Sequence, residues 1–301
     1  MGAIFINIVL GISIRKGSET LERKIIKKVQ GFRTRDGPGV SLVRVLGRDT
    51  IEDFDPILML DSFDSTNPDD YTKGFPMHPH RGIETISYLY KGKMVHKDTL
   101  GNEDAITSGE VQWMNSGSGI EHEERIPEAD RLLGVQLWLN LPKKDKMSQP
   151  SYHRVTNDEI KEIDIDGGKL RLLAGKYKDE TGHMGEHLPF NYYDTHLDKG
   201  KTFEMTMKVD ESIMLFTLVG EIEVAGEKVA EKTAVKLSEG DSLKITSLMG
   251  GAQILYMSSK KLDEPVAWSG PIVMNTPQEI QEAYIDLRNN TFIKNELIIR
   301  I

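Results

Sequence analysis

The sequence predicts an all-β protein of two domains. Hydrophobic residues alternate with polar ones over residues 133–141 and 203–209, and a period of two is typical of strands with one buried face. Other runs of β-branched and aromatic residues are separated by turn sequences such as DGPG at 36–39 and SEGD at 238–241. Short strands joined by such turns favour a barrel or a sandwich, and 301 residues is the length of about two ordinary domains.

The order of the elements suggests the domain boundaries. A polar segment at 142–152 interrupts the strand pattern and predicts a linker. We therefore expect an N-terminal extension over 1–24, a first domain over 25–145 and a second over 146–301. Thr276-Pro277 followed by Glu279 is typical of a capped helix start, and it predicts a helix over about 277–289 that packs on the β-domains. The tail 291–301 is a candidate for one more strand.

The composition excludes several classes of protein. The chain has no cysteine, so any metal must bind to nitrogen and oxygen ligands. A formal net charge of −9 disfavours direct nucleic-acid binding, because that affinity comes from clustered Lys and Arg. The apolar stretch at 3–14 is too short to cross a membrane as a helix, and no basic residue precedes it as in a secretory signal. We expect a cytoplasmic monomer without a membrane partner.

Two short motifs are candidates for a metal site. Side chains two residues apart on a strand point to the same face, so His78 with His80, and His122 with Glu124, can each present two ligand atoms in one direction. Three imidazole nitrogens and one carboxylate oxygen suit Fe, Mn, Ni, Cu or Zn better than Ca or Mg. Four protein ligands would leave one or two coordination positions open for water, O₂ or a substrate oxygen.

The pattern His-x-[Asp/Glu] is not specific by itself. About one match is expected by chance in a chain with 8 His and 47 acidic residues, and His96-x-Asp98 and His196-x-Asp198 match it too. His96 is expected either at the mouth of the metal pocket or in a structural role. His183, His187 and His196 are expected on the surface or between the domains, and no functional role is expected for His153 at the end of the linker.

Three longer segments resemble the pirin family of the cupin superfamily. Residues 74–85 (GFPMHPHRGIET) resemble the first cupin motif in its pirin form, and residues 109–124 (GEVQWMNSGSGIEHEE) resemble the second. Residues 270–276 (GPIVMNT) resemble the segment that closes pirin chains. The resemblance implies two tandem cupin (jelly-roll) β-barrels with one metal, usually iron(II), in the first; Mn, Ni, Cu and Zn remain alternatives.

The resemblance also implies a ligand set, which is His78, His80, His122 and Glu124. Many cupins use the glutamate of the first motif instead, so Glu84 remains an alternative ligand. The second barrel is expected to hold no metal, since no His occurs between residues 199 and 268.

The family implies two functions. The first is a quercetin 2,3-dioxygenase-like enzyme in which a flavonol or another enol reacts with O₂ while Glu124 accepts the hydroxyl proton. The second is a redox-sensing regulator that binds partner proteins without turnover. The residues that flank the ligands are candidates for the pocket walls: Met77, Trp113, Met114 and Ile120.

Overall fold

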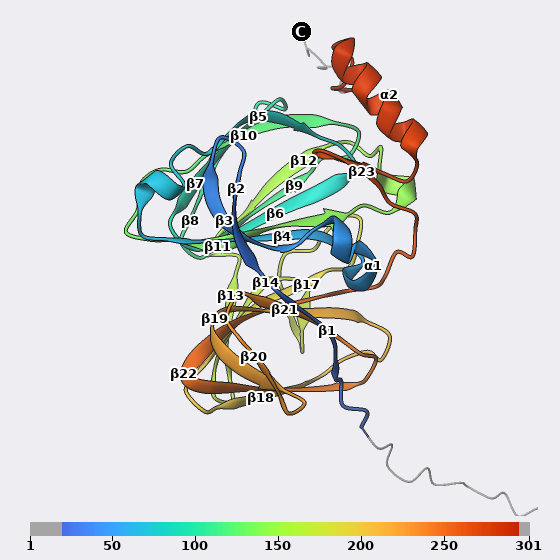
Figure 1. Ribbon diagram of the computed structural model, residues 1–301. Helices are drawn as coiled ribbons and strands as arrows, with labels where there is room; N and C mark the ends of the chain where they lie inside the picture. Colours follow the sequence, from blue (N-terminus) through green and yellow to red (C-terminus); the bar gives the residue numbers. More distant parts are fainter. Residues whose placement is uncertain (1–19, 295–301) are drawn as a thin grey trace, which may run out of the picture.

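The computed structural model describes residues 20–294, which form two antiparallel β-barrels, one above the other (Figure 1). The all-β prediction is confirmed. The apolar stretch 3–14 and the end of the tail, 295–301, lie outside the described residues, so the predictions for them stay predictions. No helix of residues 20–294 is long and apolar enough to cross a membrane.

The first barrel is built from two sheets. Its strands are β2 (Phe32–Asp36), β3 (Val40–Leu46), β4 (Ile57–Ser65), β5 (Phe75–His80), β6 (Ile83–Lys91), β7 (Lys93–Asp98), β8 (Glu103–Thr107), β9 (Glu110–Asn115), β10 (Ile120–Arg125), β11 (Leu132–Asn140) and β12 (Ser151–Val155). The larger sheet has the order β12-β9-β6-β11-β4-β3-β2 and the smaller one β5-β10-β7-β8. A four-residue helix, α1 (Ile51–Phe54), precedes β4.

The second barrel is one curved sheet of nine strands. They are β1 (Ile25–Gln30), β13 (Lys161–Ile165), β14 (Gly168–Ala174), β17 (Asn191–Leu197), β18 (Thr202–Thr206), β19 (Ser212–Val224), β20 (Glu227–Val229), β21 (Thr233–Leu237) and β22 (Ser242–Ser259). The start of β22 pairs with β18 and its second half pairs with β17, which lets a single sheet supply both walls. Two short hairpins complete the strands: β15 (Lys176–Tyr177) with β16 (Glu180–Thr181), and β23 (Ala267–Ser269) with β24 (Ile272–Met274).

The predicted C-terminal helix is confirmed as α2 (Pro277–Arg288). The Thr276 side chain accepts a hydrogen bond from the Glu279 amide at 3.2 Å, and the Glu279 carboxylate accepts one from the Thr276 amide at 2.8 Å. This reciprocal pair satisfies two amides that have no partner inside the helix. Ala283 of α2 packs against Ile272 and Met274 of β24, beside the first barrel (Figure 1).

The strand order differs in three places from a division at residues 145 and 146. β1 pairs with β21 in the second barrel, whereas β12 pairs with β9 in the first. The segment with β23, β24 and α2 leaves the second barrel after β22 and returns to the first (Figure 1). We therefore propose to divide the domains by their sheets. In this division the N-terminal strand β1 belongs to the second barrel, and the C-terminal segment with β23, β24 and α2 belongs to the first.

Strand β11 shows how the alternating pattern positions the site. One face carries Leu133, Val135 and Leu137, which are fully buried in a core that also contains Phe190 and Phe216 of the second barrel. The opposite face therefore points into the first barrel. Because side chains alternate along β11, one face of this strand packs between the two barrels and the other face can line a cavity.

Candidate metal centre

Three imidazoles converge at one end of the first barrel. The ring centroids of His78 and His122 are 4.4 Å apart, those of His78 and His80 4.8 Å, and those of His80 and His122 5.1 Å. One ring nitrogen from each of the three lies within 4.8 Å of the others. The sequence motifs therefore do bring these three side chains together.

The pairing of β5 with β10 produces this cluster. His122 lies directly opposite His78, and Ile120 lies opposite His80. Between His78 and Phe75 the strand β5 carries one residue more than its partner, which bulges β5 at Pro76 and Met77. β5 is an edge strand, as Pro79 predicts, because proline cannot donate a ladder hydrogen bond.

The hydrogen bonds of the rings leave one nitrogen of each free for a metal. The Nδ1 of His78 lies 2.8 Å from the Pro76 carbonyl, and the Nδ1 of His80 lies 3.0 Å from the Pro271 carbonyl. A carbonyl can only accept, so each Nδ1 carries the proton and each Nε2 presents its lone pair. The Nε2 of His122 is buried without any hydrogen-bond partner. An orphaned buried nitrogen beside two free ones fits a metal ion as the missing partner.

Burial keeps two of these imidazoles, those of His80 and His122, neutral. Burial, together with the neighbouring His78, lowers the pKa of His80 to about 3, although the Pro271 carbonyl opposes the shift. Burial and the surrounding imidazoles hold the pKa of His122 far below its usual value. Neutral imidazole is the form that binds a metal, so His80 and His122 can bind one at neutral pH without first losing a proton.

Glu124 lies at the same cavity but outside the cluster of three nitrogens. Its Oε1 accepts hydrogen bonds from Gln112 at 2.8 Å and Gln136 at 3.0 Å, and its Oε2 accepts one from Gln136 at 2.9 Å. With His78 and His80 it lines the cavity. Two side-chain amides thus hold a buried carboxylate beside the imidazoles.

Glu84 lies on the wrong face to be the alternative ligand. The turn at Arg81 and Gly82 ends β5 and starts β6 in the other sheet, so the even spacing from His78 does not carry over. Glu84 shares its face of β6 with Ile86 and Tyr88, which belong to the core between the barrels. Burial raises the pKa of Glu84 to about 7, with a contribution from Glu186 and an opposing one from a hydrogen bond with Trp113.

This buried carboxyl makes stability depend on pH. Between pH 4.5 and about 7 the unfolded chain releases the Glu84 proton while the folded protein keeps it, so the free energy of unfolding falls as pH rises, by ~3 kcal/mol in total. We expect Glu84→Gln to remove this fall. Urea unfolding of the metal-free protein at pH 5, 6, 7 and 8 measures it, with the exposed Glu282→Gln as control. Parallel curves for Glu84→Gln and wild type would contradict the assignment.

The cavity next to the imidazoles has a volume of about 700 Å³ and an aromatic lining. Trp138 stands edge-on to His80 at 5.1 Å and lies 5.6 Å from Trp268, while Phe63 and Phe75 line the cavity as well. The four candidates for the walls or for plain core do not line the cavity, and three of them are buried core residues: Trp113, Met114 and Ile120. Met77 is exposed. Trp113 instead packs in the core between the barrels, and the walls come from other strands and from the returning C-terminal segment.

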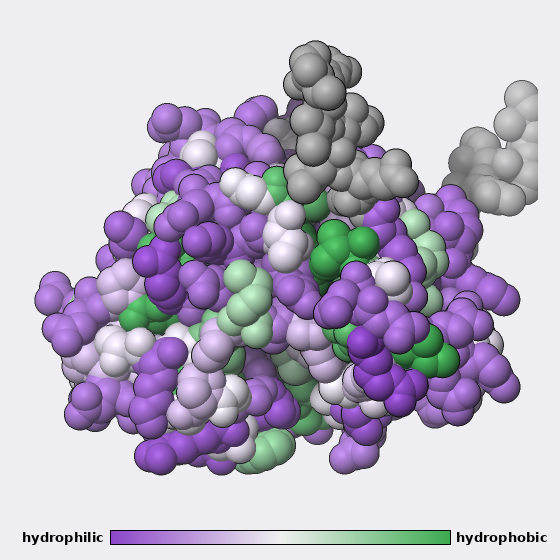
Figure 2. All heavy atoms as spheres, turned by 90° about the horizontal axis from the view of Figure 1, so that it is seen from above, coloured by the Kyte–Doolittle hydropathy of each residue, from purple (hydrophilic) through white to green (hydrophobic). Residues whose placement is uncertain are grey.

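The outer face of the first barrel is mostly hydrophilic. Seen from above, hydrophobic side chains are exposed there only in small separate groups (Figure 2). No large apolar patch is visible on the face that Figure 2 shows, whereas the cavity has apolar and aromatic lining residues, which favours a small molecule as its occupant.

The remaining histidines lie apart from the cluster of three, with one exception. His153 stacks on His183 at 4.7 Å between the barrels, and the Nε2 of His196 lies 2.9 Å from Asp194. The exception is His96, which is fully buried and contacts His122. The pattern His96-x-Asp98 is expected by chance in this sequence. Its importance becomes visible only in the structure, where β7 pairs with β10 and places His96 and Asp98 opposite Glu124 and His122.

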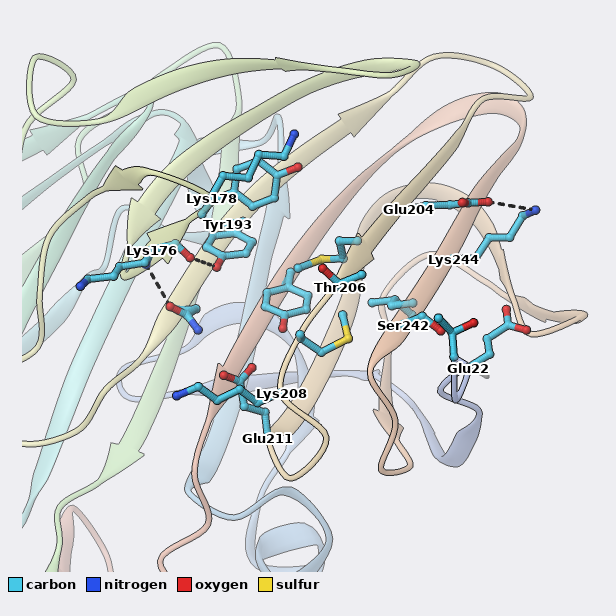
Figure 3. A pocket seen from close by; sticks show the side chains of 17 residues that line it. Glu22, Lys176, Lys178, Tyr193, Glu204, Thr206, Lys208, Glu211, Ser242 and Lys244 are labelled. Atoms are coloured by element: carbon cyan, nitrogen blue, oxygen red, sulfur yellow. Dashed lines mark hydrogen bonds and ion pairs between the residues drawn. The ribbon is translucent and has the colours of Figure 1, made fainter. Parts of the chain in front are cut away.

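The second barrel has a cavity of about 860 Å³ with a different lining (Figure 3). Tyr193 and Tyr256 stack there at 4.9 Å, and Lys244 forms a 3.2 Å ion pair with Glu204. No histidine is among the described residues that line it. Among the described residues, the cluster of imidazoles that could hold a metal lies in the first barrel.

Two family models match the chain. The Pirin model covers residues 39–139, and the Pirin C-terminal cupin domain covers residues 192–293. The chain belongs to the pirin family. A pirin-like protein of Caulobacter vibrioides is 39% identical over 277 residues, which are 90% of this chain and 99% of that protein. The pirin resemblance of the sequence motifs and the two cupin domains that it implies are confirmed.

Solved structures agree with this pirin architecture. A crystal structure of quercetin 2,3-dioxygenase from Acinetobacter baumannii matches with a TM-score of 0.83 and 31% identity, covering 90% of this chain and 98% of that one. A bacterial pirin from Escherichia coli in complex with nickel(II) matches with a TM-score of 0.62, covering 78% of this chain and 98% of that one. At 17% identity the second match shows the shared fold alone.

Proposed function

We propose that this pirin is a metal-dependent dioxygenase that acts with O₂ on a flavonol or a related enolic substrate. The observation that carries the proposal is the convergence of three imidazoles, one with an orphaned Nε2, beside a cavity with aromatic walls. The similar quercetin 2,3-dioxygenase of Acinetobacter baumannii supports the reaction class.

His78, His80 and His122 would hold the metal, with Glu124 as the fourth ligand. Three nitrogen ligands and one oxygen ligand are compatible with iron(II), which we propose first, and with Mn, Ni, Cu or Zn. Nickel(II) in the Escherichia coli pirin supports a site of this kind without fixing the metal here. A bound metal would supply a Lewis acid and a path for electrons between an enolic substrate and O₂.

The residues around the site have separate tasks in this proposal. Trp138 and Trp268 form a wall against which a planar aromatic substrate can stack. Glu124, held by Gln112 and Gln136, accepts the proton of the substrate hydroxyl group, which makes the enolate that reacts with O₂. The aromatic and apolar lining keeps bulk water away from this enolate.

Oxygen uptake tests the proposal. We expect the iron-loaded protein to consume O₂ when quercetin is added, and His80→Ala to lower the rate by at least about 100-fold, because it removes one of three nitrogen ligands. The exposed His153→Ala is the control and should keep the wild-type rate. Elemental analysis of each sample shows whether the rate follows the metal content.

The absence of O₂ uptake would contradict the proposed dioxygenase activity. If wild type loaded with each candidate metal consumes no O₂ with flavonols or simpler enols, the dioxygenase proposal fails. If partner binding then changes with the oxidation state of the metal, the redox-sensing regulator takes its place.

A further inference from the structure

His122 is held differently from the other two imidazoles. Backbone carbonyls fix His78 and His80, but the Nδ1 of His122 lies 3.3 Å from the Nδ1 of His96. Either imidazole could donate this hydrogen bond, so the contact alone does not decide whether the proton of His122 sits on Nδ1 or on Nε2. A proton on Nε2 would occupy the position where a metal must bind.

Asp98 decides the direction of this hydrogen bond. The Nε2 of His96 lies 2.8 Å from the Oδ2 of Asp98, and both side chains are fully buried. A carboxylate can only accept, so the Nε2 of His96 carries the proton and its Nδ1 is left as an acceptor. His122 must then donate from Nδ1, and its Nε2 keeps the lone pair.

Asp98 is itself held so that it acts as an acceptor at both oxygens. Its Oδ1 accepts from the Leu100 amide at 2.9 Å and the Asn102 amide at 3.1 Å, and its Oδ2 also accepts from the Asn102 side chain at 2.9 Å. Tyr152 stacks on His96 at 4.3 Å and stops the ring from turning away. The register places Asp98 opposite His122 and His96 opposite Glu124, so one strand, β7, supports the second metal-binding motif along its length.

We propose that Asp98 and His96 are positioning residues that fix the tautomer of His122 and thereby make its Nε2 a metal ligand. The inference rests on the proposed metal site, but not on turnover. It makes the pattern His96-x-Asp98 part of the site rather than a chance match.

Asp98→Asn tests the chain of hydrogen bonds directly. The two backbone amides at the Oδ1 position still require an oxygen, whereas the Asn102 side-chain amide, which donates at Oδ2, can flip to present its own oxygen. The new NH₂ group therefore takes the Oδ2 position and faces the Nε2 of His96. His96 must then accept at Nε2 and donate from Nδ1, which moves the proton of His122 to its Nε2. We expect nickel(II) to bind about 10- to 100-fold more weakly, as is typical when the partner of a metal-ligating histidine is lost.

The measurements are nickel(II) titration of the metal-free protein and ¹⁵N NMR of its histidine rings. In wild type the protonated nitrogen of His122 should be Nδ1, and in Asp98→Asn it should be Nε2. Asp198→Asn, in the matching pattern His196-x-Asp198 of the second barrel, is the control and should change neither. Unchanged nickel affinity and an unchanged His122 tautomer in a folded Asp98→Asn protein would overturn the proposal.

A second pair of variants covers the case in which Asp98→Asn does not fold. His96→Asn keeps an oxygen acceptor near the position of Nδ1, whereas His96→Leu keeps none. The proposal expects His96→Asn to bind nickel(II) more tightly than His96→Leu, and equal affinities would contradict it. Absent O₂ uptake in wild type would remove the dioxygenase but leave these binding results unaffected.

Discussion

Replacing Arg81 with Met is expected to lower the free energy of unfolding by about 3–5 kcal/mol, because it takes the charged donor away from the carbonyls of two buried residues, Ser118 and Phe292. Arg81 is only 2% exposed. Its guanidinium donates to Asp286 of α2 at 2.9 Å and to the carbonyls of Ser118 and Phe292 at 2.7 and 3.0 Å. It also lies over the Phe292 ring at 4.3 Å. One side chain therefore ties α2 and the residues after it to the end of β5.

The same change is expected to weaken metal binding. The segment that Arg81 anchors carries Pro271, whose carbonyl fixes the tautomer of His80, and the Val273 amide donates to the Arg81 carbonyl at 3.1 Å. When this segment loosens, His80 loses the partner that presents its Nε2. We expect a loss of affinity for nickel(II) of about tenfold or more, as for other partners of ligating histidines.

Urea unfolding of the metal-free protein and nickel(II) titration measure the two effects. Arg125→Met is the matched control: Arg125 pairs with Glu103 at 2.7 Å, but both side chains are more than half exposed, so its loss should cost at most about 1 kcal/mol. Limited proteolysis should cut Arg81→Met faster than Arg125→Met after β22. Equal stability of the two variants would show that the C-terminal segment is held by other contacts.

The local pattern of the sequence predicts the parts of this protein that depend on neighbours along the chain. The alternation in β11 predicts a strand with one buried face, and the pair Thr276 and Glu279 predicts the start of α2. His78 and His80 share a face because they lie on one strand, and the facing strand β10 brings His122 to them. The buried face of β11, the start of α2 and the shared face of His78 and His80 follow from a period of two or from helix capping, whereas the approach of His122 requires the pairing of β5 with β10.

The other parts of the site depend on contacts between distant segments, and no local pattern encodes them. The partner of His80 is 191 residues away, and that of Arg81 is as many as 211 residues away. Even spacing failed for Glu84 because a turn between two sheets intervenes after His80. The link from Asp98 to His122 crosses between strands, so its short sequence pattern could not be told from chance.

Gly82→Ala is expected to have the largest effect of any single methyl group added at this site. Gly82 has a φ of +79°, and a Cβ there would lie 2.0 Å from the Val273 carbonyl oxygen. The same Val273 oxygen accepts a hydrogen bond from the Lys146 ammonium group at 3.0 Å, and the Gly82 carbonyl oxygen accepts another from it at 2.8 Å. The methyl group must therefore push the returning segment and the turn after β5 apart.

Gly101→Ala separates this clash from backbone strain. Gly101 has a similar φ of +91°, but no atom lies within 4 Å of its added Cβ. The left-handed backbone alone should cost about 1–2 kcal/mol at either position, so the clash accounts for whatever Gly82→Ala loses beyond that. For Gly82→Ala we expect the free energy of unfolding to fall by more than about 4 kcal/mol, because single substitutions cost this much only when they disrupt core packing or the backbone. Because Pro271 moves with Val273, the affinity for nickel(II) should fall in Gly82→Ala and stay unchanged in Gly101→Ala. Equal nickel(II) affinities of the two variants would mean that β24 shifts without disturbing His80.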